Sequence, residues 1–250
     1  MTPLPRLSRI PGAGLQLSAW TWNAGAPGLP IVALHGVTNS GSQWAATAVA
    51  ISPARRFIAL DARGHGESDW DPDEAYAVDH HFADVATALD ALQIEHCLLA
   101  GFSMGGGVAI LAAACLPERV AGLVVIDAYP HPEQSAGSAR IARWVAERAY
   151  LTRRFDPAIS RRFRELLADG VATRADLRPM WEAVACPALV VRGAQSNVLL
   201  AETAGDMLAS LPSARLHTLE GVGHAIPDER PGELAGLLAR FAGELERGCA

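Results

Sequence analysis

The chain contains no lysine, because all 21 of its basic residues are arginine. Schiff-base catalysis, attachment of pyridoxal phosphate and a P-loop lysine are therefore excluded. The sequence also lacks a Gly-x-Gly-x-x-Gly segment after its first strand-like run and a His-Glu-x-x-His pair. Neither nucleotide binding nor zinc binding has support from such motifs. We therefore expect a protein that uses no cofactor and no metal ion.

Charge and hydropathy disfavour a nucleic-acid-binding protein and a membrane-spanning protein. The formal net charge is −6, whereas a nucleic-acid-binding domain carries a basic face. The longest apolar run, residues 108–116, is too short to cross a bilayer, and residues 1–10 lack the apolar core of a signal peptide. The four cysteines are scattered, which favours reduced thiols in a cytoplasmic protein. We expect no nucleic-acid or membrane partner, and the oligomeric state is left open.

One serine lies between two glycines in the segment Gly101-Phe102-Ser103-Met104-Gly105. The apolar residues 98–100 precede this segment, and an alanine-rich stretch that predicts a helix follows it. Gly-x-Ser-x-Gly between a strand and a helix is typical of a nucleophile elbow, a strained turn that exposes the serine hydroxyl. A Cβ at either glycine would collide as strand and helix fold back on each other.

Three other segments of the sequence contain a glycine next to a histidine. Residues 31–34 are apolar and end in His35-Gly36-Val37, residues 57–61 lead into Arg63-Gly64-His65-Gly66, and a late Gly-x-Gly-His segment ends at His224. In this order the segments resemble the α/β-hydrolase superfamily over roughly residues 14–245. The resemblance implies a mostly parallel eight-stranded sheet covered by helices on both faces, with the ligand site outside the carboxyl ends of the strands.

Periodicity and composition place the expected elements along the chain. Strands are expected at residues 14–22, 31–34, 57–61, 96–100, 120–126, 188–192 and 215–219, and helices at 42–51, 79–92, 103–116, 199–210 and 229–246. Residues 129–184 read as helices throughout and stand where the superfamily inserts a cap. The expected domains are thus a core of residues 1–128 and 185–250 and a helical cap of residues 129–184.

The expected cap is rich in arginine, with ten in residues 129–184. This charge could attract a substrate with an acidic group or an acidic carrier. The alternative, which we favour, is that the arginines lie on solvated helix faces. We also expect a hydrophobic substrate pocket, although aromatic residues at such spacing often serve packing alone. The residues assigned to the pocket are His35, Phe102, Tyr129, His131, Trp144 and Trp181.

The resemblance assigns a catalytic role to each motif. Ser103 is the expected nucleophile, and His224 is the expected base, since a serine hydroxyl needs a base to take its proton. The backbone N–H groups of Met104 and Val37 match the superfamily's oxyanion-hole positions. These two residues would act through the main chain, so their side chains carry little information about the role.

The third catalytic residue departs from the family pattern. Residues 191–197 read Val-Arg-Gly-Ala-Gln-Ser-Asn, so Asn197 stands where the superfamily usually has an aspartate. An asparagine can orient an imidazole ring but cannot stabilise the imidazolium by charge. Asp127, directly after the strand expected at residues 120–126, is the acid we favour. Asn197 as a neutral orienting group and another carboxylate, Glu202 or Asp206, are the alternatives.

These assignments predict a cofactor-independent serine hydrolase that acts through an acyl-enzyme on an ester, lactone or thioester of a small to medium hydrophobic acid. Hydrolysis of a carbon–carbon bond, perhydrolysis and acyl transfer could use the same three residues. Epoxide hydrolases and haloalkane dehalogenases are disfavoured because they have an aspartate where this chain has Ser103. A ligand-binding protein without catalysis is the alternative from a different class, since a fold does not guarantee an activity.

Overall fold

A single sheet organises the chain. The computed structural model describes residues 4–51, 53, 55–131, 136–147, 155–168 and 175–248. Over these residues eight strands form one sheet in the order β1-β2-β4-β3-β5-β6-β7-β8. Each pair from β4 through β8 is parallel, whereas β2 runs antiparallel to both of its neighbours. The strands are β1 (Arg6–Pro11), β2 (Gln16–Trp22), β3 (Ile31–Leu34), β4 (Phe57–Asp61), β5 (Cys97–Phe102), β6 (Val120–Ile126), β7 (Ala188–Gly193) and β8 (Ala214–Leu219).

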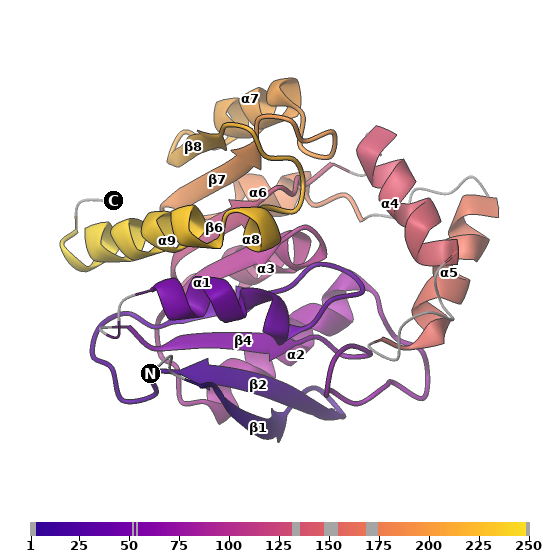
Figure 1. Ribbon diagram of the computed structural model, residues 1–250, viewed down its shortest axis with the longest axis horizontal. Coiled ribbons are helices and arrows are strands. Elements are labelled where there is room, and N and C mark those ends of the chain that lie inside the picture. The colour runs from indigo at the N-terminus through magenta and orange to yellow at the C-terminus, as the bar shows by residue number, and fades with distance from the viewer. Residues whose placement is uncertain are drawn as a thin grey trace.

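Helices cover both faces of this sheet (Figure 1). On one face α1 packs against α9, and on the other α2 packs against α3. The central strands β3 and β5 are buried along their whole length, as is typical of parallel strands covered on both sides. The helices of the described residues are η1 (Gly41–Trp44), α1 (Ala45–Ala50), α2 (Val78–Ala91), α3 (Met104–Cys115), α4 (Ala136–Glu147), α5 (Pro157–Ala168), α6 (Arg178–Glu182), α7 (Ala201–Ser210), α8 (Ile226–Glu229) and α9 (Pro231–Glu246).

The elements differ from the expected ones in three places. Strand β1 was not expected, because at the sheet edge most of its side chains are exposed and the sequence shows no clear alternation. The helix expected at 42–51 is a 3₁₀ turn, η1, followed by α1. The helix expected at 229–246 begins only at Pro231, because α8 ends at Glu229 and the intervening Arg230 has non-helical backbone angles.

Helices α4 and α5 pack against each other to one side of the sheet, in the direction in which β7 points (Figure 1). Val145 of α4, Ile159 of α5 and Phe155, which lies just before α5, form a small apolar cluster, against which Val37 of the core also packs. The start of α5 is fastened to the core, because the backbone N–H of Asp156 donates to the carbonyl of Gly64 at 2.7 Å.

Helix α6, by contrast, packs with the core. It contacts α3 and α7, and Trp181 is 1% exposed within the main apolar cluster. The indole Nε1–H of Trp181 donates to the carbonyl of Met207 at 2.9 Å. Trp181, expected in the substrate pocket, therefore has a packing role, because its ring and its one polar atom are both taken up by the core.

Three histidines are buried together beneath the carboxyl ends of β3 and β4. The ring of His65 lies 5.1 Å from that of His35 and 6.5 Å from that of His81, measured between centroids. Burial lowers the pKa of His35 to about 4 and, together with the neighbouring rings, lowers the pKa of His65 and of His81 to about 3. All three side chains are therefore neutral near pH 7.

This cluster predicts that the folded protein loses stability in mild acid. In the unfolded chain each histidine binds a proton below about pH 6.5, whereas the folded state keeps it neutral. The stability is thus fully present above pH 6.5 and falls as the pH drops toward 4, by about 2 kcal/mol per histidine at pH 5.

The variant His65→Asn, which can still donate to the carbonyl of Arg63, tests this expectation. It should reduce the slope of unfolding free energy against pH between pH 5 and 6 by about 1.4 kcal/mol per pH unit. Urea unfolding at several pH values measures this pH dependence of the unfolding free energy. His96→Asn, at an exposed position, is the control, and equal slopes for the two variants would contradict the prediction.

Candidate active site

The turn between β5 and α3 holds Ser103 in a strained conformation. Its φ is 52° and its ψ is −113°, in a region that residues other than glycine rarely adopt. The flanking glycines allow the close backbone approach that the turn needs: a Cβ on Gly101 would lie 2.2 Å from the carbonyl oxygen of Gly105, and one on Gly105 would lie 2.4 Å from that of Leu34. Strain of this kind, about 1–3 kcal/mol, is retained where the surrounding structure fixes it.

His224 reaches this serine from the loop after β8. Its Nε2 lies 3.2 Å from Ser103 Oγ, and its Nδ1 lies 2.6 Å from Asp127 Oδ2. The imidazole packs on the ring of Phe102, with 4.8 Å between centroids. Its side chain is 20% exposed, so one part of the ring faces solvent. The hydroxyl, the imidazole and the carboxylate thus form one continuous hydrogen-bonded chain.

Asp127 is fully buried at the end of β6 and has a φ of 44°. Besides His224, its carboxylate accepts hydrogen bonds from the hydroxyl of Ser196 at 2.5 Å and from the N–H of Gly193 at 3.2 Å. Asn197 is exposed. The structure therefore brings Asp127, and not Asn197, against His224.

Sequence reasoning missed both Ser196 and Gly193 as partners of the carboxylate. The only signal for them was their position within the four residues before Asn197, in the segment where the family pattern places its acid. Neither residue type is unusual in such a loop, so nothing in the sequence distinguishes a hydrogen-bond donor there from an ordinary turn residue.

Two backbone N–H groups belong to segments next to Ser103, since Met104 follows it in the chain and a Cβ on Gly36, the residue before Val37, would lie 3.5 Å from the Cβ of Ser103. Met104 is the first residue of α3, where an N–H has no acceptor within the helix. Val37 follows His35 and Gly36 after β3. Within the described part of the chain neither N–H donates to another group of the protein, whereas the neighbouring N–H of Gly105 donates to the carbonyl of His35 at 3.2 Å. The positive end of the α3 dipole adds to the potential beside Ser103.

The other residues assigned to the pocket are Phe102, Tyr129, His131, Trp144 and His35. Phe102 lies against His224, and the buried Tyr129 lies 6.5 Å from the half-buried His131, measured between ring centroids. Trp144 on α4 is 39% exposed. His35 is 1% exposed, its Nδ1–H donates to Gly36 at 2.7 Å and its Nε2 accepts from the N–H of Ala62 at 3.0 Å. Its ring therefore joins two loops and has no nitrogen left for a substrate.

Several arginines of the helical insertion are already paired. Arg161 pairs with Glu74, Arg178 pairs with Asp176 at 2.6 Å, and Arg164 donates to the carbonyl of Ala146 at 2.8 Å. These contacts favour solvated helix faces. Four other arginines of this segment, Arg148, Arg153, Arg154 and Arg174, lie outside the described residues.

In the described ranges, no group of three or more histidine, cysteine, aspartate or glutamate side chains is arranged to hold a metal ion. A helix of the length and apolarity needed to span a bilayer is also absent from these ranges.

Comparison with known proteins identifies the family. The model of the alpha/beta hydrolase family matches residues 31–237. The chain belongs to the α/β-hydrolase family. A solved structure of an E-2-(acetamidomethylene)succinate hydrolase superposes with a TM-score of 0.79 at 21% identity, over 96% of this chain and 99% of that one. Together with the observed sheet and helices, these matches confirm the predicted fold class.

Two curated relatives indicate hydrolases. Esterase YbfF of Escherichia coli is 28% identical over 236 residues, which is 85% of this chain and 92% of that protein. Epoxide hydrolase 4 of Mus musculus is 39% identical over 126 residues, 50% of this chain. The latter match spans about a third of the mouse protein, 34% of its length.

The contrast between Ser196 and Asn197 predicts unequal effects on stability. Ser196→Ala removes a buried donor from the carboxylate of Asp127 and should lower the free energy of unfolding by about 1–3 kcal/mol. Asn197→Ala, one residue away and exposed, should change it by less than about 0.5 kcal/mol. Urea unfolding of both variants at pH 7.5 measures the difference. Equal stabilities would contradict the view that Ser196 holds this carboxylate.

Proposed function

We propose that this α/β-hydrolase is a serine hydrolase that acts through an acyl-enzyme on an ester, lactone or thioester of a small to medium hydrophobic acid. The observation that carries the proposal is the hydrogen-bonded chain from Ser103 through His224 to Asp127. The match to a curated esterase over most of the chain supports it.

Acylation follows from the order of these bonds. The hydroxyl of Ser103 donates to Nε2 of a neutral His224, whose Nδ1–H donates to Asp127. As the serine oxygen attacks the carbonyl carbon, its proton passes to Nε2, and the buried carboxylate stabilises the imidazolium that forms. The substrate oxygen gains the negative charge, and the N–H groups of Met104 and Val37 donate to it. One such donor is worth about 3–4 kcal/mol.

Release of both products uses the same groups. The imidazolium gives its proton to the departing alcohol or thiol, which completes acylation and leaves the serine ester. His224 then takes a proton from water as the water oxygen attacks the acyl carbon, and it returns this proton to the oxygen of Ser103 as the acid is released. A different acceptor in place of this water would give perhydrolysis or acyl transfer, so these activities share every step up to the acyl-enzyme.

The character of the acyl group follows from the surroundings of Val37. The apolar side chains Val145, Phe155 and Ile159 of the helical insertion gather against Val37, beside the proposed oxyanion position. Such surroundings favour an apolar acyl group over a charged one, because an unpaired charge is costly to bury. We propose that α4 and α5 act as the cap that excludes water from this side of the site.

The proposal predicts that Asp127 and Asn197 differ sharply in importance. Asp127→Asn should lower kcat on a p-nitrophenyl butyrate substrate by about 10⁴-fold, because the imidazolium loses its counter-charge. Asn197→Asp should stay within about threefold of the parent protein, since the acid is already present at position 127. Steady-state kinetics measures kcat of both variants, and circular dichroism verifies that they are folded. An Asp127→Asn variant of undiminished activity would show that another group orients His224.

A covalent probe separates catalysis from simple ligand binding. A fluorophosphonate should label the parent protein on Ser103 and leave Ser103→Ala unlabelled, because only an activated serine attacks phosphorus readily. If folded protein neither hydrolyses activated esters nor reacts with the probe, the proposed function is wrong and the alternative of a protein without catalysis is favoured.

A further inference from the structure

The side chain of Gln43 joins two loops of the candidate site. It lies in η1 and is 9% exposed. Its Oε1 accepts a hydrogen bond from the N–H of Gly36 at 3.2 Å, and its Nε2 donates to Oδ2 of Asp228 at 2.9 Å. Gly36 directly precedes Val37, and Asp228 lies in α8, just after His224. The amide thus links the loop of a proposed oxyanion donor to the segment of the proposed base.

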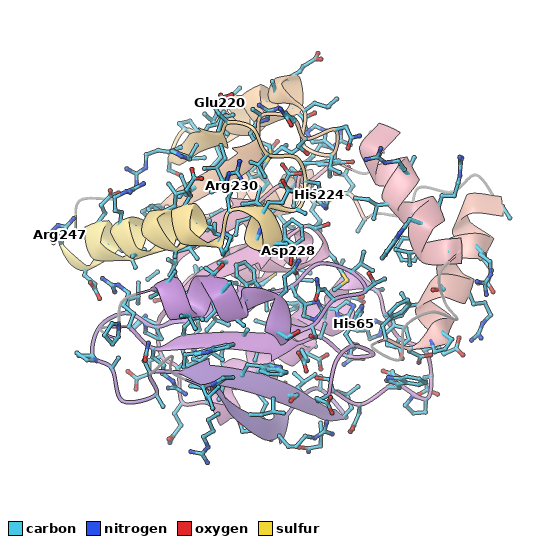
Figure 2. All side chains as sticks on the ribbon, viewed as in Figure 1. His65, Glu220, His224, Asp228, Arg230 and Arg247 are labelled. Atoms are coloured by element: carbon cyan, nitrogen blue, oxygen red, sulfur yellow. The ribbon has the colours of Figure 1, made fainter. Side chains whose placement is uncertain are left out.

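The Asp228 end of this link is held by local backbone bonds. The N–H of Ile226 donates to the carbonyl of His224 at 2.9 Å, and that of Asp228 donates to Ala225 at 3.1 Å. The intervening Ile226 is completely buried, which fixes α8 against the core. Figure 2 shows His224 and Asp228 close to α8. The backbone position of Asp228 is therefore coupled to that of His224.

A second contact joins the same loops. A Cβ on Gly36 would lie 2.9 Å from the ring of Phe102, so that ring is packed directly on the glycine. The other side of the contact is the imidazole of His224, 4.8 Å away between centroids. Apolar packing limits how closely the loops approach but leaves them free to slide. A directional hydrogen bond at each end of Gln43 removes that freedom.

We propose that Gln43 and Asp228 are positioning residues that keep the Val37 loop and the His224 loop in one relative placement. Proton transfer by His224 and oxyanion binding by Val37 then act on the same carbonyl group. Neither residue touches the substrate, and the inference rests on the proposed function. A shift of about 1 Å at a reacting group can reduce a rate about a hundredfold, so a link of this kind has a measurable effect.

The test is an exchange of donor and acceptor. Gln43→Glu can still accept from Gly36, but it has no N–H for Asp228 and places two carboxylates together. We expect kcat to fall about tenfold with KM changed less than about threefold, because the loss concerns geometry in the transition state. Asp228→Asn keeps an acceptor for Gln43 and should have nearly the parent kcat. In the double variant the new amide can donate to the new carboxylate, so kcat should return to within about threefold of the parent value.

Gln195→Glu is the matched control. The side chain of Gln195 is exposed, and its backbone N–H donates to the carbonyl of Val222, two residues before His224. The variant therefore adds the same charge near the proposed base but leaves the hydrogen bonds of Gln43 intact. It should have the parent kcat. An unchanged kcat in Gln43→Glu, an equal fall in Gln195→Glu, or a double variant no faster than Gln43→Glu would each overturn the proposal.

Failure of the proposed function would be visible separately, because the parent protein would then neither turn over esters nor react with a fluorophosphonate. The same variants can in that case be compared by the NMR signals of the His224 imidazole, which need no substrate. A signal displaced in Gln43→Glu and restored in the double variant supports the link. Signals that are identical in all variants overturn it.

Discussion

The buried carboxylate of Asp127 is the interaction on which the arrangement around Ser103 depends. It lies at the end of β6 and accepts hydrogen bonds from Gly193, Ser196 and His224, which belong to the ends of β7 and β8 and the loops after them. A buried carboxylate is costly unless it is fully hydrogen-bonded. The charge can therefore be buried only when these loops are assembled, and their assembly is also what places the imidazole beside the serine.

A second constraint is steric. At Gly101 and Gly105 the backbones of β5, α3 and the end of β3 approach so closely that no side chain fits. This approach forces the positive φ of Ser103 and puts the first N–H of α3 beside its hydroxyl. The loop after β3, which carries Val37, is held at the same place. Fold and candidate site thus arise from the same few contacts between strand ends.

The sequence predicts best those features that depend on neighbours in the chain. The elbow around Ser103 and the Gly-x-Gly-His segment are local patterns, and together with the apolar runs they were sufficient for the fold class. The sequence favoured Asp127 but left Asn197 as an alternative, because the choice depends on which side chain of two adjacent strand ends points toward His224. Gln43 has no motif at all, since its two partners are brought together only by the folded chain.

Composition alone was a weaker guide than pattern. Trp181 was assigned to the pocket because it lies in an aromatic-rich segment, yet α6 packs it into the core. His35 was assigned there as well, yet backbone groups occupy both of its nitrogens. The helix predicted at residues 229–246 did not allow for the break that the backbone makes at Arg230, before Pro231. The cytoplasmic location and the substrate stay predictions, because neither depends on a contact within this chain.

The most direct test of the account is to trap the acyl group on the protein. The parent protein is mixed rapidly with p-nitrophenyl butyrate, quenched in acid during turnover and digested, and its peptides are examined by mass spectrometry. The account predicts a butyryl group on the peptide that contains Ser103, and neither this group nor turnover at the parent rate in Ser103→Ala. A butyryl group on another residue, or a Ser103→Ala variant that hydrolyses the ester as fast as the parent, would contradict it.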